Sequence, residues 1–197
     1  MSNQLFVIAG PNGAGKSTSS AEILKKYNIT AFDWDFEFYS VWKKFDFDPL
    51  VEEGVRSKTS EKLQQLINKS LASKQSFSYE TNFHQEYSFE IAHHAKEKGF
   101  ETNLIFLLVD AIDICIKRVE KRYNSGGHFV DEKTIENRFF LGLKNLNVAI
   151  EYFDNIFLFD TSIDYKVKSV LTVRNKEIIR LKHPIPQSVI EHLPNLK

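Results

Sequence analysis

The chain has 197 residues, of which 26 are Lys or Arg and 26 are Asp or Glu, so its formal net charge is zero at pH 7. This length suits one sizeable domain, and we predict a single domain over residues 1–197. The balanced charge argues against an electrostatic nucleic-acid partner. No run is long and apolar enough to span a bilayer, and the N-terminus lacks a signal-peptide pattern, so we expect a cytoplasmic protein with no membrane partner.

The first predicted element is a strand over residues 5–9, and a helix over 19–27 follows it. The loop between them reads G-P-N-G-A-G-K-S-T and fits the phosphate-binding pattern G-x-x-x-x-G-K-[ST]. Its glycines let successive N–H groups point inward around phosphate oxygens, and the new helix adds its positive end. The predicted nucleotide-binding residues are Gly10, Asn12, Gly13, Ala14, Gly15, Lys16, Ser17 and Thr18.

Two side chains of this loop carry the expected chemistry. Lys16 would reach the β- and γ-phosphates of ATP, and the Ser17 hydroxyl would hold Mg²⁺. The alternative is a Gly-rich turn that merely joins a strand to a helix. Because three glycines, the lysine and the serine are all present in strand–loop–helix context, we predict ATP and Mg²⁺ as cofactors.

Strands and helices alternate along the rest of the chain. Predicted strands cover 29–32, 76–81, 102–109 and 156–159, and predicted helices cover 60–73, 87–99, 110–122 and 131–152. Residues 36–48 have no clean period and fit either a helix or a loop. The alternation predicts an α/β three-layer fold with a mostly parallel sheet, and together with the phosphate-binding loop it fits the P-loop NTPase/kinase fold. A small C-terminal β-hairpin is expected at about 166–182.

The phosphate-binding loop alone does not define the reaction. A GTPase needs Asn-Lys-x-Asp, and the late candidate at 175–178 lacks the Asp. Transporter-type ATPases carry Leu-Ser-Gly-Gly-Gln, which 124–128 matches only faintly, and the acidic pair that should follow lies too far on. A small chain with an Asp after its second strand fits a small-molecule kinase.

Four blocks make the chain resemble the zeta toxin family of P-loop kinases. They are the unbroken 9–18 loop, Asp33-Trp34-Asp35 after the second strand, Glu80-Thr81 after the third, and Arg118-Val119 leading to Gly126-Gly127-His128-Phe129-Val130 with Arg138 on the next helix. Two positions depart from the family pattern. The family's Asn is Asp33 here, so two carboxylates compete for one role, and the family's Pro is Asp131, which we interpret as a helix N-cap.

Phosphoryl transfer needs an oriented acceptor hydroxyl and neutralised phosphate charge. Asp35 is the predicted general base, at the carboxyl end of a strand where open α/β sheets place ligands, although a helix N-cap is the alternative. The family pattern also places the base at the second acidic position, and Asp33 then becomes structural or a partner of Mg²⁺.

Arginines surround the glycine break, and we expect a lid at about 122–138 that closes over ATP. Arg122 and Arg138 are favoured over Arg118 as catalytic phosphate clamps, against the alternative of solvated helix arginines. The resemblance implies that Glu80 and Thr81 contact substrate, although a solvated strand end explains them equally. His128 is predicted to touch phosphate or substrate, and a loop-capping histidine is the alternative.

The leading hypothesis is an ATP-dependent small-molecule kinase. The resemblance implies UDP-N-acetylglucosamine or a similar nucleotide-activated sugar as acceptor, with an antitoxin protein as a further partner. A kinase acting on another metabolite, and a nucleotide-gated binding protein with slow hydrolysis, remain the other hypotheses. The sequence does not choose among acceptors, because residues 36–75, which should shape that pocket, carry no recognisable motif.

Overall fold

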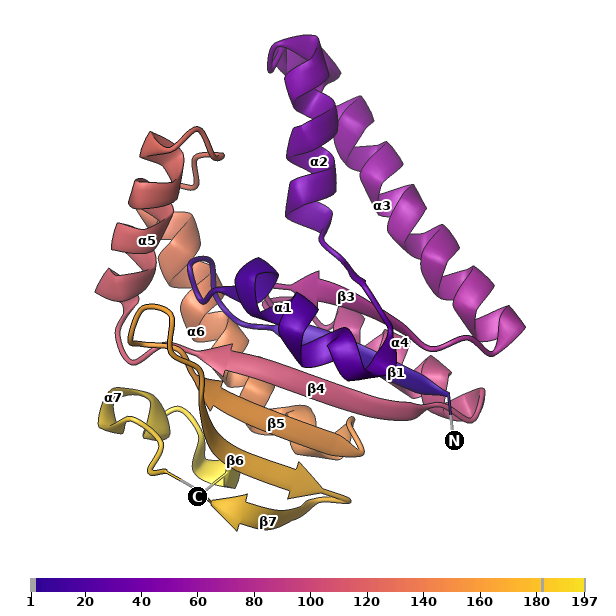
Figure 1. Ribbon diagram of the computed structural model, residues 1–197, viewed down its shortest axis with the longest axis vertical. Helices are drawn as coiled ribbons and strands as arrows, with labels where there is room; N and C mark the ends of the chain where they lie inside the picture. Colours follow the sequence, from indigo (N-terminus) through magenta and orange to yellow (C-terminus); the bar gives the residue numbers. More distant parts are fainter. Residues whose placement is uncertain (1–2, 182, 197) are drawn as a thin grey trace.

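The computed structural model describes residues 3–181 and 183–196, so the ends of the predicted domain and residue 182 of the predicted hairpin lie outside the described part. A seven-stranded sheet runs through the molecule in the order β2-β3-β1-β4-β5-β6-β7 (Figure 1). The strands are β1 (Gln4–Ala9), β2 (Ala31–Phe32), β3 (Phe77–Thr81), β4 (Glu101–Leu108), β5 (Asn155–Asp160), β6 (Lys168–Arg174) and β7 (Glu177–Leu181).

The first five strands pair in parallel, and β6 and β7 add an antiparallel hairpin at one edge. This arrangement confirms the predicted α/β fold with its mostly parallel sheet and C-terminal hairpin. β1 lies between β3 and β4, and every residue of β1 and β4 after the first is buried. Continuous apolar runs are what strands covered on both faces require.

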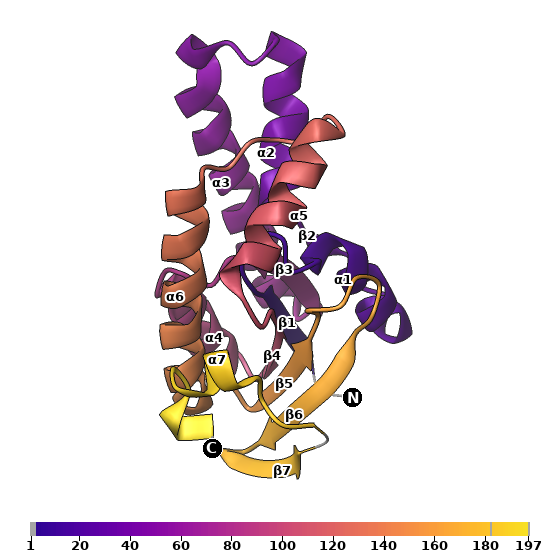
Figure 2. The same ribbon diagram turned by 90° about the vertical axis from the view of Figure 1, so that its left-hand side faces the viewer.

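Helices cover the two faces unequally. The α-helices are α1 (Lys16–Leu24), α2 (Trp34–Trp42), α3 (Pro49–Ser73), α4 (Tyr87–Glu97), α5 (Ile112–Asn124), α6 (Glu132–Val148) and α7 (Gln187–Ile190). Figure 2 shows α1 on one side of the sheet and α4, α6 and α7 on the other. The α2–α3 pair projects away from the sheet, and α5 stands across from it.

Several helix limits differ from the sequence prediction. α1 begins at Lys16 rather than at residue 19, because the phosphate-binding loop turns directly into the helix. α3 begins at Pro49, eleven residues before the predicted start at 60, and Asp48 caps it by accepting a hydrogen bond from the Leu50 N–H. An Asp followed by Pro at the first helical position is a known start signal. The open region 36–48 is largely α2, and α7 was not anticipated.

Within residues 3–181 and 183–196, no helix is long and apolar enough to cross a membrane.

Candidate active site

The phosphate-binding loop is held in a shape that requires glycine. Gly13 has a φ of 82°, and a Cβ there would lie 2.8 Å from the carbonyl oxygen of Cys115 in α5. Both the left-handed backbone and the close approach therefore exclude other residues. Cys115 is fully buried, and burial raises the pKa of its thiol to about 11.

Arg118 braces this loop from outside. Its guanidinium donates hydrogen bonds to the carbonyl oxygens of Gly13, at 3.2 Å, and Thr161, at 2.8 Å, and it pairs with Asp164. The Thr161 hydroxyl lies 2.9 Å from the Ala14 carbonyl oxygen. The Arg118 guanidinium is thus occupied by backbone carbonyl oxygens and by Asp164.

Lys16 lies inside the loop rather than in solvent. Its Nζ donates to the carbonyl oxygens of Gly10, at 2.7 Å, and Pro11, at 3.1 Å, and to Oδ1 of Asn82, at 2.9 Å. Desolvation lowers the pKa of Lys16, and the negative charge of Asp35 is the largest opposing effect. Sequence reasoning missed Asn82, although its place at the carboxyl end of β3 directly after Glu80-Thr81 was a usable signal.

Ser17 brings two carboxylates together. Its Oγ lies 2.6 Å from Oδ2 of Asp33 and 2.9 Å from Oε2 of Glu80. The other carboxylate oxygen of Glu80 accepts a hydrogen bond from Ser20 at 2.7 Å. Burial, followed by the charge of Asp33, raises the pKa of Glu80. Since a hydroxyl donates only one proton, Ser17 can donate to only one of the two carboxylates at a time, which leaves an oxygen acceptor available to a cation.

The two aspartates that the sequence paired are separated by the start of α2. Asp33 is the N-cap, and its Oδ1 accepts from the Phe36 N–H at 3.0 Å. Asp35 lies in the first turn of the helix. Its carboxylate has no hydrogen bond or ion pair among the described residues. The cap suggested for Asp35 as an alternative is therefore made by Asp33.

The glycine break forms a loop between α5 and α6, inside the region 122–138 predicted as a lid. Asp131 caps α6 by accepting from the Thr134 N–H, as predicted. Arg138 of α6 donates to Oδ1 of the buried Asn12 at 3.0 Å. Arg122 of α5 contacts Nε2 of His128 with its Nη2 at 2.8 Å.

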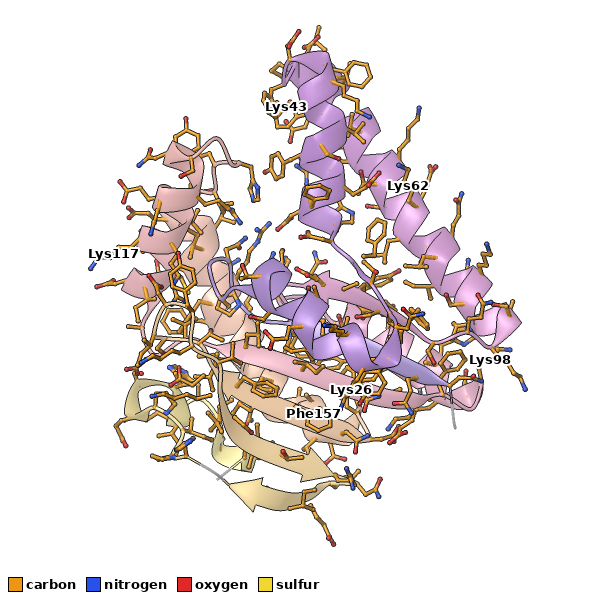
Figure 3. The ribbon with its side chains drawn as sticks, viewed as in Figure 1. Lys26, Lys43, Lys62, Lys98, Lys117 and Phe157 are labelled. Carbon is orange, nitrogen blue, oxygen red and sulfur yellow. The ribbon has the colours of Figure 1, made fainter. Side chains whose placement is uncertain are left out.

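A large cavity joins these groups. It encloses about 1610 Å³ between the phosphate-binding loop, the α2–α3 pair and the lid. Figure 3 shows side chains of these elements converging above α1. The predicted site residues that line it are Asn12, Gly13, Ala14, Gly15, Lys16, Ser17, Thr18, Asp35, Glu80, Thr81, Arg122, His128 and Arg138.

Two residues that line the cavity, Thr81 and His84, differ in how their polar atoms are satisfied. The Thr81 hydroxyl accepts from the Phe83 N–H at 3.0 Å and so supports a turn as well as facing the cavity. His84, which sequence reasoning did not single out, also lines the cavity, and its buried Nδ1 has no hydrogen-bond partner. Burial, then the charge of Arg138, lowers the pKa of His84.

His128 makes a testable contribution to the pH dependence of stability. Burial and the neighbouring Arg122 lower the pKa of His128 to about 4, from an ordinary value of 6.5. The unfolded chain therefore binds a proton here between pH 6.5 and 4 that the folded chain does not, so the folded state loses stability as pH falls through that window. We therefore compare the melting temperatures of His128→Phe and the unaltered chain at pH 7 and pH 4.5. The melting temperature of the variant should rise relative to that of the unaltered chain as the pH is lowered. An equal difference at both pH values would contradict the neutral buried imidazole.

The geometry now defines a class. A phosphate-binding loop at the end of β1, an internal lysine, a Ser beside two carboxylates and arginines across a large cavity are the parts of a P-loop kinase. Residues 2–177 match the zeta toxin family, so the chain belongs to the zeta toxin family of P-loop kinases and is an ATP-dependent phosphotransferase.

Solved structures show the same fold. A chain of the PezAT chromosomal toxin–antitoxin system of Streptococcus pneumoniae aligns with a TM-score of 0.71 at 16% identity, over 99% of this chain and 78% of that one. A chain of the AvrRxo1-ORF1:-ORF2 structure with ATP aligns with a TM-score of 0.72 at 18% identity, over 98% of this chain but only 63% of that one. Among curated proteins, none matches this chain.

Proposed function

We propose that the chain transfers the γ-phosphate of ATP to a hydroxyl of a nucleotide-activated sugar such as UDP-N-acetylglucosamine. One observation carries the proposal: the carboxylate of Asp35, which has no hydrogen-bond partner among the described residues, shares a cavity with Lys16 and the lid arginines. A general base must be free to accept the hydroxyl proton as the phosphate arrives. The choice of a sugar nucleotide as the acceptor rests on the family resemblance alone.

Magnesium fits the group around Ser17. Among the residues that the structure describes, no cluster of three or more His, Cys, Asp or Glu side chains is placed to hold a metal ion. Mg²⁺ at a kinase site needs fewer protein ligands, because phosphates and waters complete its coordination. Ser17 would bind the ion, with Asp33 and Glu80 orienting the hydroxyl and the bound waters. The ion would neutralise charge on the β- and γ-phosphates.

Glu80 accordingly changes role within the proposal. Its two carboxylate oxygens face Ser17 and Ser20, which favours the magnesium side of the cavity over the expected contact with the acceptor. Thr81 and His128 also have protein partners for their polar groups. Thr81 keeps its place as an acceptor contact in the proposal, because its side chain lines the cavity beyond Glu80.

We also propose a protein partner of the antitoxin kind. The support comes from the relatives: one belongs to a toxin–antitoxin system, and the other is a complex of two open reading frames. Co-expression with the product of a neighbouring reading frame, followed by co-purification, tests this part separately from the chemistry.

The acceptor is tested by incubating the chain with Mg²⁺ and γ-labelled ATP and a panel of acceptors. UDP-N-acetylglucosamine is compared with UDP, with free N-acetylglucosamine and with unrelated sugars and metabolites. Label on the intact sugar nucleotide, and little on either half, is the expected result. Label on a different member of the panel would retain the kinase and replace the acceptor.

Removing either lid arginine should lower kcat more than ATP affinity. Arg122 and Arg138 line the cavity, where their guanidinium groups would stabilise charge that develops during transfer. Arg122→Ala and Arg138→Ala should each slow transfer by about a hundredfold or more, as for other transition-state donors. Steady-state kcat and a direct ATP-binding measurement give the comparison. An unchanged kcat in both variants would mean that Arg122 and Arg138 are solvated helix arginines with no role in transfer.

A further inference from the structure

We propose that Tyr39 is a positioning residue for phosphoryl transfer: its ring holds His128, and His128 in turn holds Arg122 over the cavity. This inference rests on the proposed role of Arg122. Neither the motif nor the family resemblance singles out Tyr39, which lies in the region that carried no recognisable pattern.

The first contact joins two elements far apart in the chain. The rings of Tyr39, on α2, and His128, in the loop after α5, are stacked with their centroids 3.9 Å apart and their planes 9° apart. Figures 1 and 2 both show the C-terminal end of α5 and the loop after it extending toward α2. The stack thus bridges the two walls of the cavity that both residues line.

The second contact fixes the protonation of the imidazole. Nη2 of Arg122 lies 2.8 Å from Nε2 of His128. A guanidinium has donors only, so Nε2 must be the bare acceptor nitrogen and the ring must be neutral, with its proton on Nδ1. The lowered pKa of His128, about 4, agrees with that state at neutral pH.

The backbone of the lid brings His128 to this place. The Gly127 N–H donates to the Arg122 carbonyl oxygen at 2.9 Å, and a Cβ at Gly127 would lie 2.7 Å from Cγ of Arg122. The chain therefore folds back directly onto the arginine. The loop thus places the imidazole of His128 beside the Arg122 guanidinium, and the ring of Tyr39 packs against the face of that imidazole.

The contacts of Tyr39 connect the helix that carries Asp35 with the arginine that would contact the phosphate. Tyr39 follows Asp35 by four residues on α2, so both side chains lie on one face of the helix. Both also line a smaller pocket of about 170 Å³, together with His128 and Arg138. An arginine held by a stacked histidine loses its side-chain freedom before ATP binds, rather than during transfer. Tyr39 thus links the helix that carries the proposed base to an arginine on the phosphate side.

The test compares Tyr39→Leu, which removes the ring, with Tyr39→Phe, which keeps it. Phe45→Leu, at an exposed aromatic just beyond α2 and outside the cavity lining, is the matched control. We measure ADP release from Mg²⁺·ATP with and without UDP-N-acetylglucosamine. Because transfer of the phosphate to water also releases ADP, kcat and KM can be obtained without that acceptor. We expect Tyr39→Leu to lower kcat on the order of tenfold, below the loss in Arg122→Ala, with the KM for ATP unchanged. Tyr39→Phe and the control should match the unaltered chain.

A double variant and a spectrum separate positioning from other roles. Tyr39→Leu should cost nothing further in the Arg122→Ala background, because both changes remove the same interaction. In the proton spectrum, the ring protons of His128 should lose a ring-current shift in Tyr39→Leu and keep it in Tyr39→Phe. Equal melting temperatures confirm folding.

The two proposals fail in different ways. If Arg122→Ala retains full kcat, the proposed role of Arg122 fails. If Arg122→Ala is slow while Tyr39→Leu is as fast as the unaltered chain, the role of Tyr39 alone is overturned. Loss of activity in Tyr39→Phe as well would assign the effect to the hydroxyl and also overturn positioning by the ring.

Discussion

Replacing Lys16 with alanine should abolish phosphoryl transfer while the chain stays folded. Its Nζ lies in the phosphate-binding loop, bonded to the carbonyl oxygens of Gly10 and Pro11 and to Asn82. A cation at this place meets the β- and γ-phosphates, and its loss removes charge stabilisation worth about a thousandfold or more in rate. The desolvation that lowers the pKa of Lys16 also means that removing the charge relieves a cost of folding.

Lys25→Ala is the matched control, since Lys25 is an exposed lysine at the end of the same helical segment. Melting temperature and single-turnover transfer are measured for both variants. If Lys16→Ala still turns over ATP, the phosphate-binding loop does not have the proposed role in phosphoryl transfer.

Asp35→Asn should block transfer to the acceptor while the variant still binds Mg²⁺·ATP. The amide cannot take the proton of a hydroxyl, but the groups around Ser17 are untouched. Asp35 has no hydrogen bond or ion pair in the described part of the chain, so the substitution leaves no partner unsatisfied. ATP affinity and single-turnover transfer, measured on the folded variant, separate binding from chemistry.

Asp33→Asn is the companion variant. Asp33 caps α2 and accepts from Ser17. Because Asn caps a helix about as well as Asp, stability should change little, while the lost charge should weaken the Mg²⁺ dependence with transfer largely retained. An inactive Asp33→Asn beside an active Asp35→Asn would reverse the two roles.

Local patterns predicted the parts of the fold that local physics determines. The loop at 10–18 fixes its own shape through glycines and the helix that follows it. Residues 104–108 of β4 form a continuous apolar run, which is typical of a central strand that is covered on both faces. The hairpin of β6 and β7 was visible from two apolar runs around 174–177.

The remainder depends on contacts between distant residues. α2 and α3 pack on each other, with Arg56 over the rings of Trp34 and Phe38, and the spacing of apolar residues in the sequence does not reveal this pairing. Glu80 meets Ser17 across 63 positions of sequence, and no spacing rule encodes that pair. The stack of Tyr39 on His128 likewise joins an aromatic-rich helix to a glycine loop.

The fate of the γ-phosphate distinguishes a kinase from an enzyme that only hydrolyses ATP. The chain is incubated with Mg²⁺, γ-labelled ATP and UDP-N-acetylglucosamine, and label is followed into the sugar nucleotide and into inorganic phosphate, with Lys16→Ala as the blank. Most label should leave ATP for an organic hydroxyl, and the blank should transfer none. Label released only as inorganic phosphate with every acceptor of the panel, or transferred equally by the blank, would contradict the proposed kinase reaction.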